Sequence, residues 1–235
     1  MKKILTIVLC LAIMLSLCAC GKKGGNSDVT PDNTPAADSA GNSQDGGKEK
    51  EVDAITSATA DINWVPRYNG NKNSDILVVY FSTDETVRAV ALHAAQALNA
   101  DIFEIVPAEP YTDDDLNYNA PDYRAGKEQK EGARPAIKSM PEDLSRFKYI
   151  LLGYPIWGGQ APAIIYTFLE NADLHDVEII PFCTSNSSNA GTSATNLQKV
   201  TDPSVKWREA FRLIRNGTVE DIRNWLESLE IAELK

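Results

Sequence analysis

Cysteine and histidine are scarce in this chain, and no dense run of basic residues is present. Its 235 residues include 4 cysteines and 2 histidines, and 33 acidic side chains outnumber 23 basic ones, for a formal net charge of -10. Because so acidic a surface repels phosphate backbones, we expect no nucleic-acid partner. The hydrophobic content of 43% is typical of a globular protein of one or two domains.

Three of the four cysteines lie in the first twenty residues, which have the pattern of an export signal. A basic start at residues 1–3 precedes an apolar run at residues 4–20 that ends in Leu-Cys-Ala-Cys. This ending resembles the bacterial lipobox, which implies cleavage before Cys20 and lipidation of its thiol, although Cys18 stands where Ser, Ala or Thr is usual. A plain secretory signal and an uncleaved N-terminal anchor are the alternatives.

Loss of the signal would leave Cys183 as the one free thiol of the mature chain. An intramolecular disulfide and a metal cluster built from thiolates are then both excluded. Cys183 itself is expected to be a small buried apolar residue, and His93 and His175 are expected to be structural or solvated.

Residues 21–74 are predicted to form a disordered linker. Residues 21–50 consist mainly of Gly, Ser, Asn, Asp, Pro and Lys, with Val29 as the largest apolar side chain. Such a segment buries too little apolar surface to offset the entropy of ordering it. As a flexible chain, residues 21–60 would span roughly 35 Å. We therefore expect a domain that is lipid-anchored to the outer face of the bacterial cytoplasmic membrane.

The folded domain is predicted over residues 75–230. Its strands are continuous apolar runs, as in parallel strands buried on both faces, and helical periodicity separates them. This alternation indicates an α/β doubly wound fold. Residues 107–146 are expected to be loop with one short helix near residues 126–131, and the run of three Asp at residues 113–115 to be solvated. Strands are predicted at residues 76–81, 102–106, 149–153, 177–182 and 205–213, and helices at residues 87–98, 164–169, 194–199 and 219–229.

Three loops follow strand ends, where doubly wound sheets bind their ligands. Residues 82–85 place hydroxyls at a helix N-terminus, which suits an anion. Residues 154–160 contain Trp157, an aromatic plane for stacking, and residues 183–192 are rich in small hydrogen-bonding side chains.

These motifs, in this order, resemble the flavodoxin-like fold, and more narrowly a bacterial flavodoxin-like family that binds flavin mononucleotide (FMN). The resemblance covers residues 75–229 and implies a five-stranded parallel sheet of order 2-1-3-4-5. The motifs are Val79-Tyr80-Phe81-Ser82, then Gly153-Tyr154-Pro155-Ile156-Trp157 with Gly159, Ala161-Pro162, and Ile180-Pro181-Phe182-Cys183-Thr184-Ser185 leading to Gly191.

The resemblance also implies a role for each loop. In such a site the redox chemistry belongs to the flavin, and no side chain need act as acid or base. The expected function is electron transfer, or reduction of a small acceptor such as a quinone. Trp157 packed under a tight turn is the alternative for the second loop. The implied contacts are Ser82, Thr83 and Thr86 to phosphate, Tyr154, Pro155, Ile156, Trp157 and Gly159 to one side of the ring, and Thr184, Ser185, Asn186 and Gly191 to the other.

The first loop departs from the family pattern, which reads approximately Ser-x-Thr-Gly-x-Thr. Here it is one residue shorter, and Asp84 and Glu85 stand where Gly and a neutral residue belong. A phosphate would meet like charge and would lack the Gly that permits close backbone approach. Two alternatives follow: a binding module of this fold that takes a neutral or cationic ligand, and a scaffold whose acidic face recruits a basic partner.

A second flavin motif precedes the domain. Residues 53–59 resemble the short Asp-x-x-Ser/Thr-Gly-Ala-Thr motif of exported flavoproteins that carry FMN bonded through its phosphate to the final Thr, here Thr59. Ser57 occupies the Gly position. A flavin tethered in this way could dock at high effective concentration without a good phosphate loop. A polar linker of this composition is the ordinary alternative.

Overall fold

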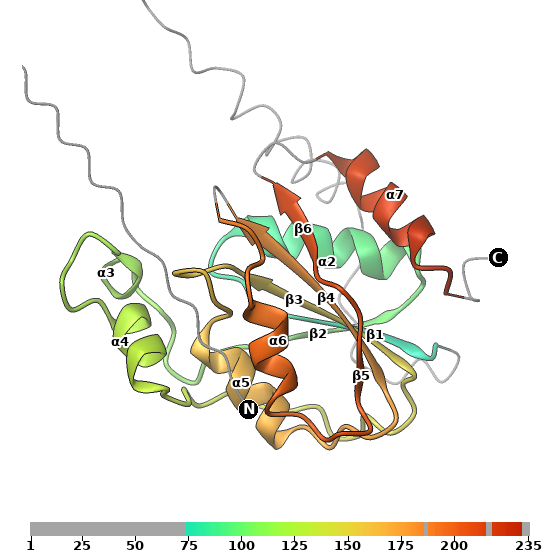
Figure 1. Cartoon of the computed structure of the whole chain (residues 1–235), viewed down its shortest axis with the longest axis horizontal. Coiled ribbons are helices and arrows are strands. Elements are labelled where there is room, and N and C mark those ends of the chain that lie inside the picture. Colours follow the sequence, from blue (N-terminus) through green and yellow to red (C-terminus); the bar gives the residue numbers. More distant parts are fainter. Residues whose placement is uncertain (1–73, 186–187, 215–217, 232–235) are drawn as a thin grey trace, which may run out of the picture. The chain divides into compact units, whose positions relative to one another are not determined.

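A parallel β-sheet forms the centre of the computed structural model, which describes residues 74–185, 188–214 and 218–231 (Figure 1). The strands run in the order β2-β1-β3-β4-β5, and β6 also pairs with β4. All pairs are parallel. The doubly wound fold and the order 2-1-3-4-5 are confirmed. The strands are β1 (Ile76–Tyr80), β2 (Asp101–Glu104), β3 (Tyr149–Pro155), β4 (Glu178–Ser185), β5 (Lys206–Trp207) and β6 (Phe211–Ile214).

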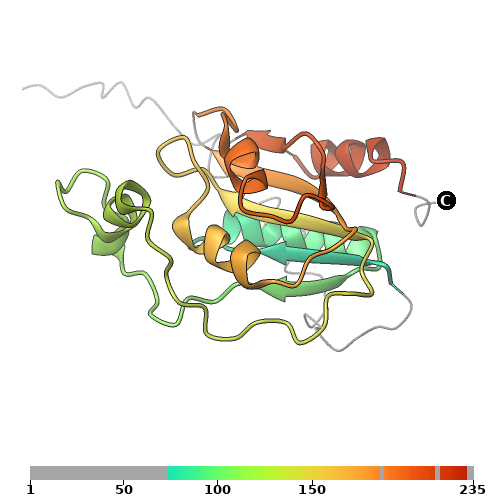
Figure 2. The same cartoon turned by 60° about the horizontal axis from the view of Figure 1, so that its bottom comes forward.

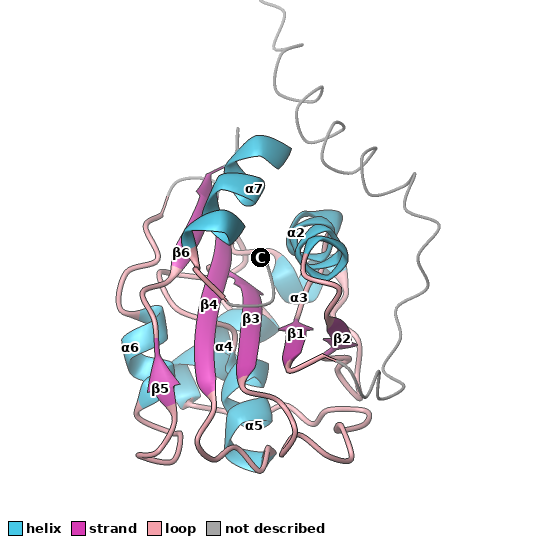
Figure 3. Cartoon of the chain, turned by 90° about the vertical axis from the view of Figure 1, so that its right-hand side faces the viewer, coloured by secondary structure: helices cyan, strands magenta, loops and turns pink. Residues whose placement is uncertain are grey.

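Helices cover both faces of this sheet. Figure 3 shows α2 (Glu85–Ala97) and α7 (Val219–Ser228) on one face, and α5 (Ala163–Asn171) and α6 (Ser193–Gln198) on the other. Successive residues of β1 join two different apolar clusters, one on each face, because side chains alternate along a strand. Burial on both faces explains why β1 reads as one continuous apolar run. In the described part of the chain, no helix is long and apolar enough to cross a membrane.

The fifth strand is split in two, where the sequence predicted one strand at residues 205–213. Its parts pair with β4 at Ile179 and at Phe182, which leaves residues 180–181 opposite residues 208–210. Three residues against two make a bulge. Pro181 lies in this gap and has no N–H to donate, so a regular ladder is interrupted there. The sheet of the described residues therefore has six strands, because the predicted fifth strand forms both β5 and β6.

Residues 107–146 contain two helices where one was predicted: α4 (Arg124–Glu131) is the helix predicted near residues 126–131, and α3 (Asp113–Leu116) was not predicted. The run of three Asp forms α3, and Asp115 exchanges hydrogen bonds with Thr112 in a capping box. α4 ends at Gly132, whose φ of 63° is left-handed. Figures 1 and 2 show these helices at the side toward which the strands run. The predicted signal with Cys20, and the predicted linker with Thr59 except for its last residue, lie outside the described residues. That last residue, Ser74, is buried and accepts the N–H of Ile76 at 3.1 Å, so it belongs to the folded domain and not to the linker.

The pH dependence of stability is expected to reflect His93, which lies half-buried in α2. Burial, together with the charge of Arg223, lowers the pKa of His93 below its usual value. The unfolded chain therefore takes up this proton first as the pH falls. The stability that neutral His93 contributes to the folded state is fully present above about pH 6.5. It is lost as the pH falls from there toward the lower pKa of His93 in the folded protein. Unfolding free energies should show wild type losing stability relative to His93→Gln between about pH 7 and 5.5, whereas parallel pH profiles would contradict this assignment.

Candidate functional site

The first loop joins β1 to α2, and its polar groups hydrogen-bond to one another. Asp84 is the N-cap of α2, and its Oδ1 accepts the N–H of Thr86 at 2.9 Å. The Ser82 hydroxyl donates to the backbone carbonyl of Asp84, and Glu85 pairs with Arg88 at 3.0 Å. The Ser82 hydroxyl and the Thr86 N–H, which a phosphate would use, are therefore both engaged within the loop.

The second loop is a tight turn. The backbone groups of Trp157 and Gln160 exchange two hydrogen bonds of 2.9 Å each. Between them Gly158 and Gly159 have φ values of 54° and 80°, the left-handed pair that a type I′ turn requires and that Gly adopts without steric cost. The left-handed φ at position 158 therefore favours Gly there.

Trp157 lies in a cluster of three aromatic rings. Its ring centroid is 5.6 Å from that of Phe81, at the end of β1, and 5.5 Å from that of Tyr111. The interplanar angles of 82° and 78° are edge-to-face geometries. The partly buried indole is therefore held in one orientation by packing, as the tight-turn alternative predicted, and it keeps some exposed surface.

Helix α4 supports this turn from the side. The amide nitrogen of Gln129 donates to the carbonyl oxygens of Trp157 at 2.9 Å and Ala161 at 3.4 Å. Arg124 lies 4.4 Å from the Tyr111 ring centroid and bonds to Glu128, which also accepts the Tyr111 hydroxyl. Sequence patterns did not reveal Gln129 or Tyr111, because each contacts Trp157 across a long sequence separation.

The second and third loops approach each other closely. A Cβ at position 191 would lie 3.2 Å from the carbonyl oxygen of Gly159, and the φ of Gly191 is 56°, so this position favours Gly. Gln160 donates to Thr192 at 3.3 Å and accepts from Asn196 at 2.8 Å. The loops predicted to border opposite sides of a ring are therefore joined at one end.

Five residues of the predicted second and third loops lie in strands instead, and Cys183 of β4 is one of them. Tyr154 and Pro155 end β3, and Thr184 and Ser185 end β4, because the parallel ladder continues to the last pair. Tyr154 is fully buried, and its hydroxyl lies 3.2 Å from Ser193 Oγ. Burial raises its pKa above the usual value. The Tyr154 side chain is therefore packed inside the protein, where a bound ring would not contact it. Only the Tyr154 backbone can border the ring.

The remaining predicted residues are placed as follows. Ile156 is partly buried, and its N–H donates to the Thr184 carbonyl at 3.0 Å, which links β3 to β4 beyond the strand pairing. Thr83 is exposed, and Asn186 lies outside the described residues. Burial raises the pKa of the Cys183 thiol to about 11, so the thiol is protonated and unreactive at neutral pH.

The residues present fit the ring of a flavin better than its phosphate. The second and third loops offer a fixed indole, backbone polar groups and two glycines at their junction, which suits a flat heterocycle. At the first loop, the Asp84 carboxylate takes the N–H that a phosphate oxygen would accept. Phosphate binding there requires this cap to be displaced against like charge.

Gln129 is expected to position the second loop, so Gln129→Ala should weaken flavin binding about three- to tenfold. The variant removes both hydrogen bonds to the turn, each worth about 1 kcal/mol. Flavin fluorescence titration measures the change. The exposed Lys130 of the same helix supplies the control, since Lys130→Ala should bind like wild type. Equal binding by both variants would show that α4 does not hold the turn.

Three solved structures share the fold of this chain. A candidate flavoprotein from Bacteroides eggerthii shares 39% sequence identity with a TM-score of 0.62, over 68% of this chain and 99% of that chain. A candidate flavoprotein from Bacteroides uniformis shares 33% identity with a TM-score of 0.61, over 65% and 97%. A flavoprotein from Lactobacillus acidophilus, solved in complex with FMN, has the same fold at 22% identity and a TM-score of 0.50, over 64% and 97%.

Sequence comparison gives two further results. No curated protein matches the chain. The family model described as flavodoxin matches residues 75–229, the region that contains the whole sheet and all three loops. The chain therefore belongs to the flavodoxin family.

Proposed function

We propose that this protein binds FMN at the carboxyl ends of β1, β3 and β4 and uses it for electron transfer or for reduction of a small acceptor such as a quinone. The observation that carries the proposal is the junction of the second and third loops. Gly159 and Gly191 meet there beside a fixed indole, in a sheet of flavodoxin order. The FMN bound by the Lactobacillus acidophilus protein of the same fold supports the choice of cofactor.

In this proposal the residues of the chain bind and orient the cofactor. Bound FMN would supply the redox chemistry, as is usual for flavin-dependent proteins. Ile156, Trp157 and Gly159 would border one side of the ring, and Ser185, Asn186 and Gly191 the other. Ser82, Thr83 and Thr86 would hold the phosphate. The contacts of Trp157 with Phe81 and Tyr111 would fix the orientation of the indole beside the ring.

A titration tests the proposal. Purified protein is mixed with FMN and with riboflavin, and flavin fluorescence and the melting temperature are followed together. We expect quenching and a raised melting temperature, because a ligand that binds the folded state stabilises it. No response to either flavin would refute the proposal. Flavin that survives denaturation and disappears in Thr59→Ala, in an exporting host that supplies the transferase, would establish the covalent route.

A second candidate function is a binding module that keeps the fold without FMN. The capped first loop favours it, because Asp84 already fills the anion-binding end of α2. The same titration separates the two: this candidate predicts no response to FMN and a response to a neutral or cationic ligand.

We also propose that the domain acts outside the cell, held by a lipid on Cys20. The basic start, apolar run and lipobox-like ending of residues 1–20 support this. Cys20→Ser should move the protein from the membrane fraction to a soluble one and abolish labelling by a radioactive fatty acid. Unchanged fractionation and labelling would contradict the anchor.

A further inference from the structure

Arg212 in β6 differs from the other arginines in the described part of the chain. Six arginines each form an ion pair with a carboxylate, whereas Arg212 donates through Nη1 to the neutral side chain of Asn189 at 3.2 Å. Its Nε is buried and has no hydrogen-bond partner. The six pairs are Arg88 with Glu85, Arg124 with Glu128, Arg134 with Glu170, Arg146 with Asp101, Arg208 with Glu178 and Arg223 with Glu220.

An unpaired, partly buried guanidinium is costly to maintain. Arginine stays charged at every accessible pH, and removing that charge from water without a counter-charge is unfavourable. The cost is unexpected in a chain with a net charge of -10, where carboxylates are plentiful. Within the described residues, Arg212 therefore has a positive charge with no carboxylate partner and one N–H, at Nε, with no hydrogen-bond partner.

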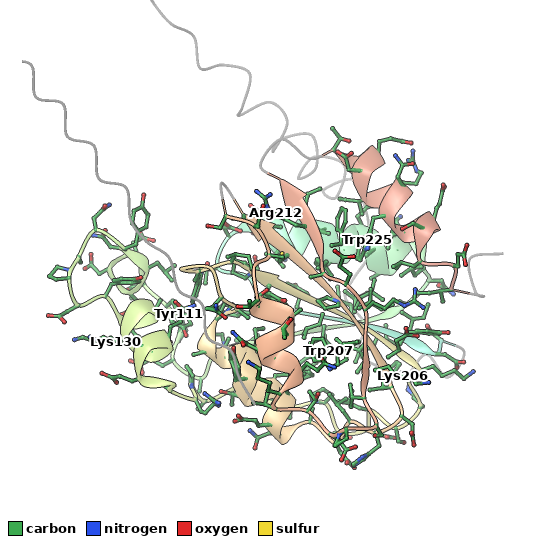
Figure 4. All side chains as sticks on the ribbon, viewed as in Figure 1. Tyr111, Lys130, Lys206, Trp207, Arg212 and Trp225 are labelled. Atoms are coloured by element: carbon green, nitrogen blue, oxygen red, sulfur yellow. The ribbon has the colours of Figure 1, made fainter. Side chains whose placement is uncertain are left out.

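The sheet register places this charge at the proposed site. Tyr154 pairs with Cys183, and Cys183 pairs with Arg212, so the three residues form one row across the sheet just before the strand ends. The hydrogen bond to Asn189 shows that the guanidinium reaches the third loop. Figure 4 shows Arg212 beside the end of β6. The third loop is one of the two that border the ring in the proposed function.

The first loop is too far away to share an anion with Arg212. β6 lies three strand intervals from β1, through β4 and β3. At about 4.8 Å per interval this is roughly 14 Å, so a phosphate held by Ser82 and Thr86 would not reach the guanidinium. Arg212 is placed for the ring and not for the phosphate.

We propose that Arg212 is a redox-tuning residue that stabilises the negative charge of the reduced flavin ring; this inference rests on the proposed function. Two-electron reduction with uptake of one proton leaves the neutral oxidised ring with one negative charge, and a nearby cation favours that form. In the test below the electrons come from dithionite, a small inorganic reductant. Arg212 thereby raises the reduction potential of the bound flavin.

The test compares four proteins: wild type, Arg212→Gln, Arg212→Lys and the control Lys206→Gln. Lys206 pairs with Glu178, five positions before Cys183 on β4, which is roughly 16 Å from the Arg212 row and beyond the Debye length of about 8 Å. Figure 4 shows the two residues at opposite ends of this edge. Arg212→Gln and Lys206→Gln change the net charge equally, so they separate a local effect from a global one.

FMN affinity of the oxidised proteins is measured first, and the potential is then measured by dithionite titration against indicator dyes. We expect Arg212→Gln to bind oxidised FMN within about threefold of wild type but to lose about tenfold in its relative affinity for reduced FMN. That loss corresponds to a potential about 30 mV lower for a two-electron couple. Arg212→Lys keeps the charge and should stay near wild type, as should Lys206→Gln.

Two outcomes overturn the inference while leaving the proposed function intact. If Arg212→Gln binds both redox forms equally less well, its potential is unchanged, and Arg212 merely holds Asn189 and the third loop in place. If Arg212→Lys shifts the potential as much as Arg212→Gln, shape and not charge sets the effect. Failure of the wild-type protein to bind flavin would instead remove the proposed function and the inference together.

Discussion

Asp84→Asn is expected to tighten FMN binding at least tenfold while leaving riboflavin binding within about twofold. Asn caps a helix as well as Asp does, so the hydrogen bond to the Thr86 N–H can persist when no phosphate is present. What the substitution removes is one negative charge beside a phosphate that carries nearly two. Two unit charges 4 Å apart interact by about 1 kcal/mol in water and about 4 kcal/mol near a protein surface, and 1.4 kcal/mol is tenfold in affinity.

Two controls accompany this measurement. Glu85→Gln removes a neighbouring carboxylate that is already paired with Arg88, so its effect on FMN binding should be smaller. Riboflavin lacks the phosphate and reports any change in the ring site itself. If Asp84→Asn changes the affinities for FMN and riboflavin by the same factor, the charge of Asp84 does not oppose the phosphate, and the interpretation of the first loop is wrong.

Gly153→Ala is expected to lower the free energy of unfolding by about 2–3 kcal/mol, a typical cost of overpacking a core. Gly153 is the fifth of the seven residues of β3, and a Cβ there would be 2.2 Å from Cζ of Phe182 and 2.5 Å from its Cε2. The Phe182 ring is buried, and the ring of Trp225 lies 5.6 Å from it, so it has little room to move away. Denaturant unfolding measures the loss.

A double variant tests whether the clash with the Phe182 ring causes the loss of stability. Phe182→Leu alone should be destabilising, because it removes ring atoms from the core. Combined with Gly153→Ala it frees the volume that the new methyl group needs, so the double variant should be more stable than the sum of the single losses predicts. Additive losses would show that the ring of Phe182 is not the obstacle, and that Gly153 is required for another reason.

The elements and their order could be predicted from sequence because each strand carries its own signal. The run at β1 is continuous and apolar, and the sheet order follows the resemblance in the loops at Ser82, Trp157 and Gly191. The split of the last strand could not be predicted, because it depends on Pro181 of the neighbouring strand and not on residues 205–213 themselves. Pairing partners decide whether an apolar run forms a regular ladder.

The sequence predicted the loops of the candidate site but not the residues outside them that contact those loops. The positions of Trp157 and Gly159 follow from local motifs, and the structure places them together with Gly191. The contact of Gln129 with the carbonyl of Trp157 joins residues 28 positions apart, and no local pattern marks it. The same is true of Arg212, whose distinction is the absence of an ion pair within the described residues, and that is a property of the packed chain.

An NMR titration with FMN is the most direct test of the central claim, that flavin binds where the second and third loops meet. In isotopically labelled protein, the indole N–H of Trp157 and the amides of Gly159 and Gly191 are followed as FMN is added. If flavin binds there, we expect large chemical-shift changes at these three groups and small ones along α7. Helix α7 packs on the opposite face of the sheet from α5 and α6. Unchanged shifts at the loops, or larger changes at α7, would contradict the claim.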